Sequence, residues 1–76
     1  MTKKIVIDSE VLSGKPIIDG TRISVEFVLE LLSSGMSIDD ILKEYPHLSR
    51  EDVLTALKYA TNVLQNEEVY NIIKVA

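Results

Sequence analysis

The sequence predicts a mainly α-helical domain with a short β element at its N-terminus. The chain opens with a β-branched run, Lys4 to Ile7, that is typical of a strand. Three stretches with the apolar spacing of helices follow, and each is preceded by a serine in the N-cap position: Ser24, Ser37 and Ser49. Because a short connection joins the second and third stretches, we expect a three-helix domain that contains a helix-turn-helix.

The β element is expected within residues 1–23. After the first strand, the segment 16–18 leads into Asp19-Gly20, a pair whose tolerance of positive φ suits a two-residue type I′ hairpin turn. In that register two pairs of residues face each other: Ile18 with Thr21, and Ile17 with Arg22. A plain turn that leads directly into the first helix is the alternative.

The three helices are expected within residues 24–66. The first has apolar residues at i, i+3, i+4 and i+7, and Gly35 stands where a C-terminal stop belongs. The middle helix is about nine residues long and is stopped by Pro46. The last is expected to end near Asn66, with five residues on its inner face: Val53, Ala56, Leu57, Ala60 and Leu64.

Acidic residues follow two of the capping serines at the spacing of a capping box. Asp40 stands three residues after Ser37, and Asp52 stands three residues after Ser49. Carboxylates at these positions also favour the positive end of the helix dipole. Capping therefore explains Asp40 better than a metal site with Asp39 does, because adjacent helical residues point about 100° apart.

The last segment, residues 67–76, is an apolar tail whose length does not decide between strand and helix. Five large apolar side chains fall in it, and we take them as candidate partner-binding residues: Val69, Tyr70, Ile72, Ile73 and Val75. The partner would be a second copy of the chain or another protein.

Length and composition point to one small, non-enzymatic domain. The 76 residues include no cysteine, so disulfides and thiolate chemistry are excluded, and no stretch reaches the ~20 apolar residues of a membrane span. With no signal-peptide pattern, the cytoplasm is the expected location. His47 is the single histidine and lacks an evident catalytic partner, and no cofactor is implied.

Charge gives a nucleic-acid role limited support. The net charge is -4, and only the N-terminal third leans positive. Counted at 100° per residue, the face of the last helix opposite Val53 carries few hydrogen-bonding groups. The candidate DNA contacts are Lys3, Lys4, Lys15, Arg50, Thr55, Lys58 and Asn62. A helical hairpin that only packs is the alternative interpretation.

Arg22 lies at the corner between the β element and the first helix. We expect its guanidinium to brace this corner by binding exposed carbonyls or a carboxylate, Asp19 or Glu26. The alternative is a contact to phosphate or to a partner protein.

The segment from Gly14 to Ile23, read as GKPIIDGTRI, resembles the hallmark of the bacterial and archaeal family catalogued as domain of unknown function 433. The resemblance spans residues 5 to about 64. It implies a homeodomain-like fold and a role as the antitoxin of a toxin-antitoxin pair, with a PIN-like ribonuclease as the toxin. We therefore expect a homodimeric antitoxin and DNA-binding transcriptional repressor, with a protein-interaction module that does not bind DNA as the alternative.

Overall fold

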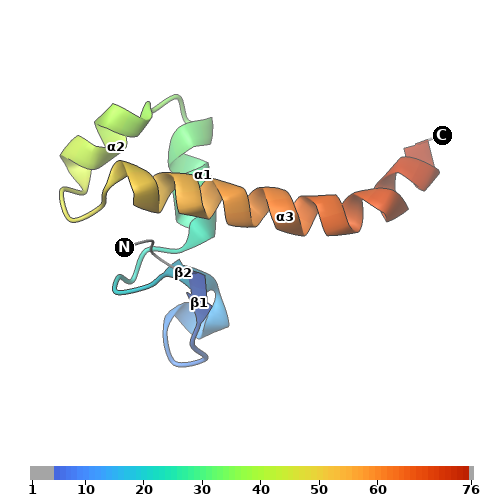
Figure 1. The fold of residues 1–76 in the computed structure, drawn as a ribbon, viewed down its shortest axis with the longest axis horizontal. Helices are drawn as coiled ribbons and strands as arrows, with labels where there is room; N and C mark the ends of the chain where they lie inside the picture. Colours follow the sequence, from blue (N-terminus) through green and yellow to red (C-terminus); the bar gives the residue numbers. More distant parts are fainter. Residues whose placement is uncertain (1–4, 76) are drawn as a thin grey trace.

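The structure is a computed structural model that describes the backbone of residues 5–75 and the side chains of residues 5–66. Three helices and a short two-stranded β element make up this part of the chain, as the sequence predicts (Figure 1). In chain order the elements are β1 (Ile5–Ile7), the 3-10 turn η1 (Leu12–Gly14), β2 (Pro16–Ile18), α1 (Val25–Ser33), α2 (Ile38–Glu44) and α3 (Arg50–Val75).

The two strands pair with each other, which corrects the predicted hairpin. β1 and β2 are antiparallel, with Ile5 opposite Ile18 and Ile7 opposite Pro16. The Asp19-Gly20 pair does form a turn, but φ is positive only at Gly20 (82°), whereas a type I′ turn needs positive φ at both residues. β2 therefore gains its main partner from the N-terminal strand instead of from the residues that follow the turn.

The hydroxyl of Thr21 explains why the predicted register beyond the turn is wrong. Its Oγ1 donates to the carbonyl of Ile18 (2.7 Å) and accepts from the N–H of Ile23 (3.0 Å). Backbone bonds still join the two sides of the turn, from the Thr21 N–H to the Ile18 carbonyl and from the Ile18 N–H to the Ile23 carbonyl (both 3.0 Å). Because the Thr21 hydroxyl binds the Ile23 N–H, the chain returns later and Ile17 forms its bridge with Ser24 instead of Arg22. Arg22 is thereby placed on the exposed side of the turn.

The three serine caps are confirmed. Ser24 Oγ accepts from the N–H of Phe27 (2.9 Å), and full capping boxes join Ser37 to Asp40 and Ser49 to Asp52. α1 ends as expected at Gly35, whose φ is +105°. The N–H groups of Gly35 and the next residue bond back to α1 carbonyls, which is the Schellman arrangement.

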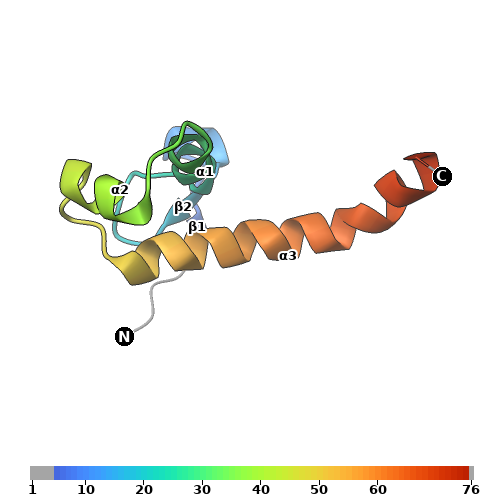
Figure 2. The same cartoon turned by 90° about the horizontal axis from the view of Figure 1, so that it is seen from above.

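The last helix is longer than predicted. α3 continues past Asn66 to Val75, so the backbone of the tail is helical up to that residue. It runs well beyond the rest of the domain (Figures 1 and 2). The predicted inner residue Leu64 is 63% exposed because it lies past the point where α3 packs on other elements. None of the described helices is long and apolar enough to cross a membrane.

The core lies where the three helices meet β2. Its members come from every one of these elements: Ile18, Val25, Val28, Ile41, Leu48, Val53 and Ala56. Leu48 is buried in the connection between α2 and α3, and Val53 points inward from the first turns of α3, the latter as predicted. This small core sets the angle between α2 and α3.

Candidate functional site

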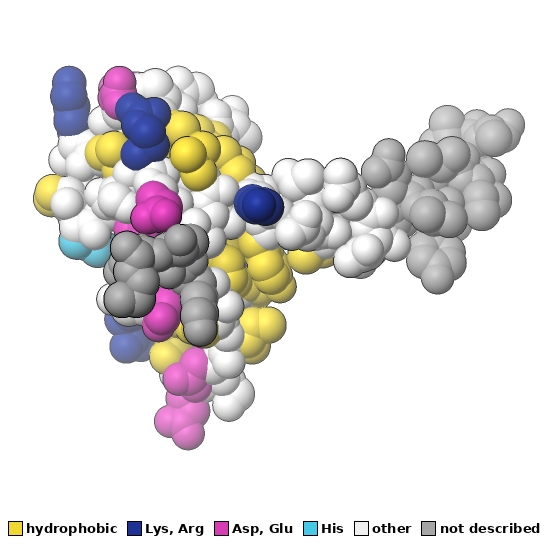
Figure 3. All heavy atoms as spheres, in the orientation of Figure 1, with side chains coloured by type: hydrophobic (Ala, Val, Ile, Leu, Met, Phe, Trp, Pro, Cys, Tyr) yellow, Lys and Arg dark blue, Asp and Glu magenta, His cyan; other side chains and the backbone are white. Residues whose placement is uncertain are grey.

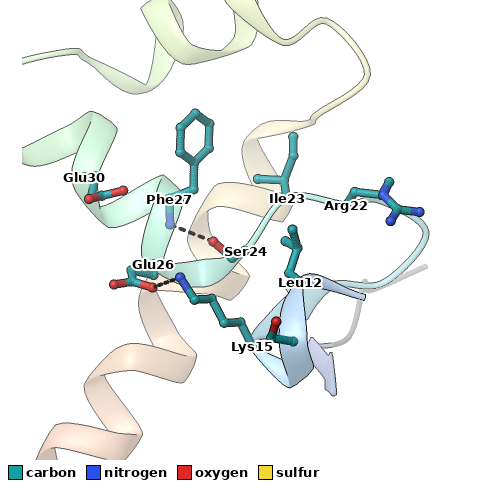
Figure 4. Close-up of a pocket in the computed structure, with 9 residues that line it drawn as sticks. Leu12, Lys15, Arg22, Ile23, Ser24, Glu26, Phe27 and Glu30 are labelled. Atoms are coloured by element: carbon teal, nitrogen blue, oxygen red, sulfur yellow. Dashed lines mark hydrogen bonds and ion pairs between the residues drawn. The ribbon is translucent and has the colours of Figure 1, made fainter. Parts of the chain in front are cut away.

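A shallow groove of about 550 Å³ lies between η1, the turn after β2 and α1, and we call it the α1 groove (Figure 4). Its lining combines three apolar side chains with two basic and two acidic ones: Leu12, Ile23, Phe27, Lys15, Arg22, Glu26 and Glu30. Lys15, Arg22 and Ile23 all belong to the GKPIIDGTRI segment. The most recognisable part of the sequence thus forms one wall of this groove.

An ion pair crosses the groove. The Nζ atom of Lys15 lies 2.9 Å from Oε1 of Glu26 on α1. The hydrogen bond to Glu26, together with the charge of that carboxylate, raises the pKa of Lys15 above its ordinary value of 10.5. Both side chains are more than half exposed, so the pair contributes little to stability and serves mainly to orient Lys15.

Arg22 does not form the predicted brace. Glu26, one of its two expected partners, is bound by Lys15, and Arg22 forms no hydrogen bond or ion pair in the part of the chain that the structure describes. Its side chain is exposed and extends away from the Lys15–Glu26 pair (Figure 4). The guanidinium, with five donors in a rigid fork, is therefore available to an acidic group from outside.

Backbone strain is concentrated at the same groove. Leu12 and Ser13 both adopt positive φ, 50° and 58°, and Gly14 follows at 82°. A left-handed conformation costs a residue with a side chain roughly 1–2 kcal/mol. Strained backbone tends to cluster at functional sites. The strained loop at Leu12 and Ser13 is therefore consistent with a binding role for the groove.

The second candidate surface is the outer face of α3. Lys58 and Asn62 are exposed and Thr55 is half-buried, and helical spacing puts the three on the side opposite Val53. The structure therefore brings together these predicted DNA contacts. Lys15 is held at the α1 groove instead, and Lys3 and Lys4 lie outside the described residues.

The start of α3 is fixed by polar contacts. Arg50, predicted as a DNA contact, forms an ion pair with Asp39 at the start of α2. Asp52 is 1% exposed, and its Oδ2 accepts the Ser49 N–H at 3.0 Å, whereas its Oδ1 has no hydrogen-bond partner among the described residues. The capping box caps the first turn of α3, and the exposed Arg50–Asp39 pair links the starts of α3 and α2 at the surface.

Charge on this side of the molecule is mixed. On the face drawn in Figure 3, the basic and acidic side chains of the described residues are interspersed and form no continuous basic patch. Glu51 stands exposed near Thr55 and Lys58 on the same face of α3. A DNA-binding surface here would need bases from two subunits or from residues outside the described part.

The groove residues Leu12 and Phe27 were missed by sequence reasoning. Phe27 packs its ring edge to face on Tyr45 at the end of α2, with centroids 5.7 Å apart, so it joins the groove wall to the helical core. The available signal in the sequence was the GKPIIDGTRI segment, Gly14 to Ile23, which lies between Leu12 and Phe27 in the chain. No group of three or more His, Asp or Glu among the described residues is placed to hold a metal ion.

The fold and these surfaces define a small three-helix domain with an N-terminal β arm. The chain belongs to the family described as Protein of unknown function (DUF433), whose model matches residues 5–60. The match covers both strands, α1, α2 and the packed part of α3. Comparisons with curated proteins and with solved structures gave no match.

Proposed function

We propose that the chain is the antitoxin of a toxin-antitoxin pair and a transcriptional repressor that binds DNA through α2 and α3. The observation that carries this proposal is the α2–α3 pair. In it a buried connection and a capping box fix a helix with exposed Lys58 and Asn62 and half-buried Thr55 on one face. In a homeodomain-like helix-turn-helix, such a helix enters the major groove.

These three side chains offer a few hydrogen-bonding groups for the recognition of DNA bases. Lys58 can bind a guanine edge or a phosphate, and the amide of Asn62 can pair with adenine. α2 would then cross the DNA backbone, as the first helix of such a pair does. Because the chain is acidic overall, we infer that two copies bind together and that the N-terminal lysines Lys3 and Lys4 supply phosphate contacts.

A binding assay on the DNA upstream of the coding sequence tests the proposal. We expect a fluorescently labelled upstream fragment to bind more tightly than an unrelated fragment of equal length and base composition, and the Asn62→Ala variant to lose most of that preference. Because Asn62 is exposed, the variant keeps its fold. Equal affinity of the intact chain for both fragments would count against a repressor role.

The α1 groove favours a second function, that of a protein-interaction module. The Arg22 guanidinium has no partner among the described residues and lies at the edge of a groove that Leu12 and Phe27 also line, which fits a partner segment that carries an acidic and an apolar residue. In the antitoxin proposal this partner is the toxin, a PIN-like ribonuclease encoded nearby. In the alternative, the chain binds a protein through this groove and does not bind DNA.

Arg22→Lys distinguishes a contact from a brace. The lysine keeps the charge but loses the bidentate fork, so we expect weaker binding to the product of the neighbouring gene with the melting temperature unchanged. Lys43→Ala, an exposed change on α2, is the matched control. A lower melting temperature for Arg22→Lys would instead indicate that Arg22 stabilises the fold, and would count against a partner contact in the groove.

A further inference from the structure

Residues 61–66 of α3 project from the domain, and their side chains do not pack on it. Every described residue from Thr61 to Asn66 is exposed, although the backbone remains helical (Figure 2). An isolated helical segment of this length is marginal in water, because most helical stability in proteins comes from packing one face. The projecting segment therefore needs a surface to pack against.

One face of this segment is apolar and continues the face that already packs on the core. Leu64 follows Ala60 by four residues and Leu57 by seven, so the three form a single stripe along α3. Leu57 and Ala60 pack on the core, whereas Leu64 is 63% exposed and the neighbouring Val63 is 38% exposed. The stripe thus extends beyond the surface that covers it.

Exposed apolar surface also lies on the strand beside this helix. Ile7 of β1 is 65% exposed, and α3 packs against β1. Figure 3 shows apolar side chains gathered in the angle between α3 and the strands. We call the apolar side of α3 formed by Leu57, Ala60, Val63 and Leu64, together with the apolar surface seen in this angle, the angle surface.

The charge pattern along α3 favours a second copy of the chain as the partner that covers the angle surface. Residues 59–66 form an uncharged stretch of α3 in a chain whose net charge is -4. In a two-fold dimer each residue near the axis meets its own copy, so a charge there would face a like charge. The amide of Gln65, which flanks the stripe, can both donate to and accept from its counterpart without repulsion. An uncharged, partly apolar helix suits a second copy better than a charged partner, which would gain no ion pair there.

We propose that the angle surface is the dimer interface, in which the α3 helices of two copies pack antiparallel near Ala60 and Leu64. Each helix then lies in the angle formed by α3 and β1 of the other copy, where Leu64 covers apolar surface that is exposed in the single chain. The small side chain of Ala60 allows the two helix backbones to approach closely. This dimer does not depend on DNA binding.

The test is the oligomeric state of the full chain by analytical ultracentrifugation over a dilution series. We expect a species of twice the 8.5 kDa of the chain, and a dissociation constant at least about tenfold higher for Leu64→Glu, which corresponds to about 1.4 kcal/mol. Asn62→Glu is the matched control, because it adds the same charge on the opposite side of the helix and should leave the dimer intact. Since both residues are exposed, circular dichroism should show an intact domain in each variant.

Three results would overturn the interface. A chain that is monomeric at every concentration has no dimer to assign. Equal effects of Leu64→Glu and Asn62→Glu would mean that added charge, and not the apolar stripe, controls association. A dimer that survives Leu64→Glu but dissociates in Ile73→Glu would place the interface in the segment after Asn66 instead.

Discussion

Replacement of Ile41 by alanine should remove a large share of the stability of the domain. Of the seven residues of α2, all within the described part of the chain, Ile41 alone is buried, with no exposed surface. The change deletes three carbon groups, which at about 0.8 kcal/mol each costs ~2.4 kcal/mol in transfer free energy alone. The cavity left behind brings the expected loss to about 3 kcal/mol, within the ~2–5 kcal/mol range for such truncations.

This loss is large because the whole domain is small. A chain of 76 residues has a free energy of unfolding of about 4–11 kcal/mol. Urea denaturation followed by circular dichroism measures the change, with Ile41→Val expected near 1 kcal/mol and the exposed Lys43→Ala within about 0.5 kcal/mol of the original chain. A loss below about 1 kcal/mol for Ile41→Ala would refute the claim that this side chain anchors α2 to the core.

Three further changes test local features of the fold. Ser24→Ala removes the acceptor for the Phe27 N–H and should cost about 1 kcal/mol in urea denaturation; an unchanged midpoint would contradict the cap. Gly35→Ala should cost about 1–2 kcal/mol because φ at Gly35 is +105°. No atom lies within 4 Å of the added Cβ, so a larger loss would mean that more than the backbone conformation is involved. The third change is at Asp40. Hydrogen bonds from the Ser37 N–H and, second, with the Ser37 side chain lower the pKa of Asp40 below its ordinary 3.8. The folded state therefore binds the proton less tightly than the unfolded state. The capping box therefore contributes stability above pH 3.8, and this contribution is lost as the pH falls through the folded pKa. In Asp40→Asn the urea midpoint should fall less steeply below pH 3.8. An equally steep fall in the variant would show that other groups carry the acid sensitivity.

The helical part of the fold could be predicted because its signals are local. A serine that caps a helix bonds to a residue three positions later, as Ser24 does with Phe27, so the sequence alone contains both partners. The stop at Gly35 and the inward positions of Leu48 and Val53 follow from equally short patterns. These are the features of the fold on which sequence and structure agree most closely.

The β element and Arg22 could not be predicted in the same way. The pairing of Ile5 with Ile18 joins residues that are distant along the chain, and strands of three residues are too short for periodicity to fix a register. The outward position of Arg22 depends on the two hydrogen bonds of the Thr21 hydroxyl, which compete with the ladder and have no periodic signature. The length of α3 was missed because Glu67 and Glu68 interrupt the apolar stripe after Leu64, and the apolar tail that follows is too short for its period to indicate a helix.

The candidate surfaces were predicted in part. Thr55, Lys58 and Asn62 share a face of α3 as the 100° spacing indicates, but Arg50 and Lys15 are each paired with a carboxylate that sequence reasoning had not matched to them. The apolar residues of the tail, Val69 to Val75, have side chains outside the described residues, so their role in partner binding stays a prediction. Cross-element ion pairs depend on the packing angle of helices, which no local pattern determines.

The salt dependence of DNA affinity tests the proposed repressor function most directly. A protein that neutralises phosphates loses affinity linearly in log salt, with a slope of about -0.9 for each phosphate contact. We predict that the intact chain binds its upstream DNA with such a slope. Lys58→Ala should either flatten the slope by ~0.9 for each phosphate contact that it removes or relax the sequence preference. Lys15→Ala should change neither the slope nor the preference, because the Lys15 ammonium is already paired with Glu26. No binding at low salt, or a Lys58→Ala variant that keeps both slope and preference, would contradict the account.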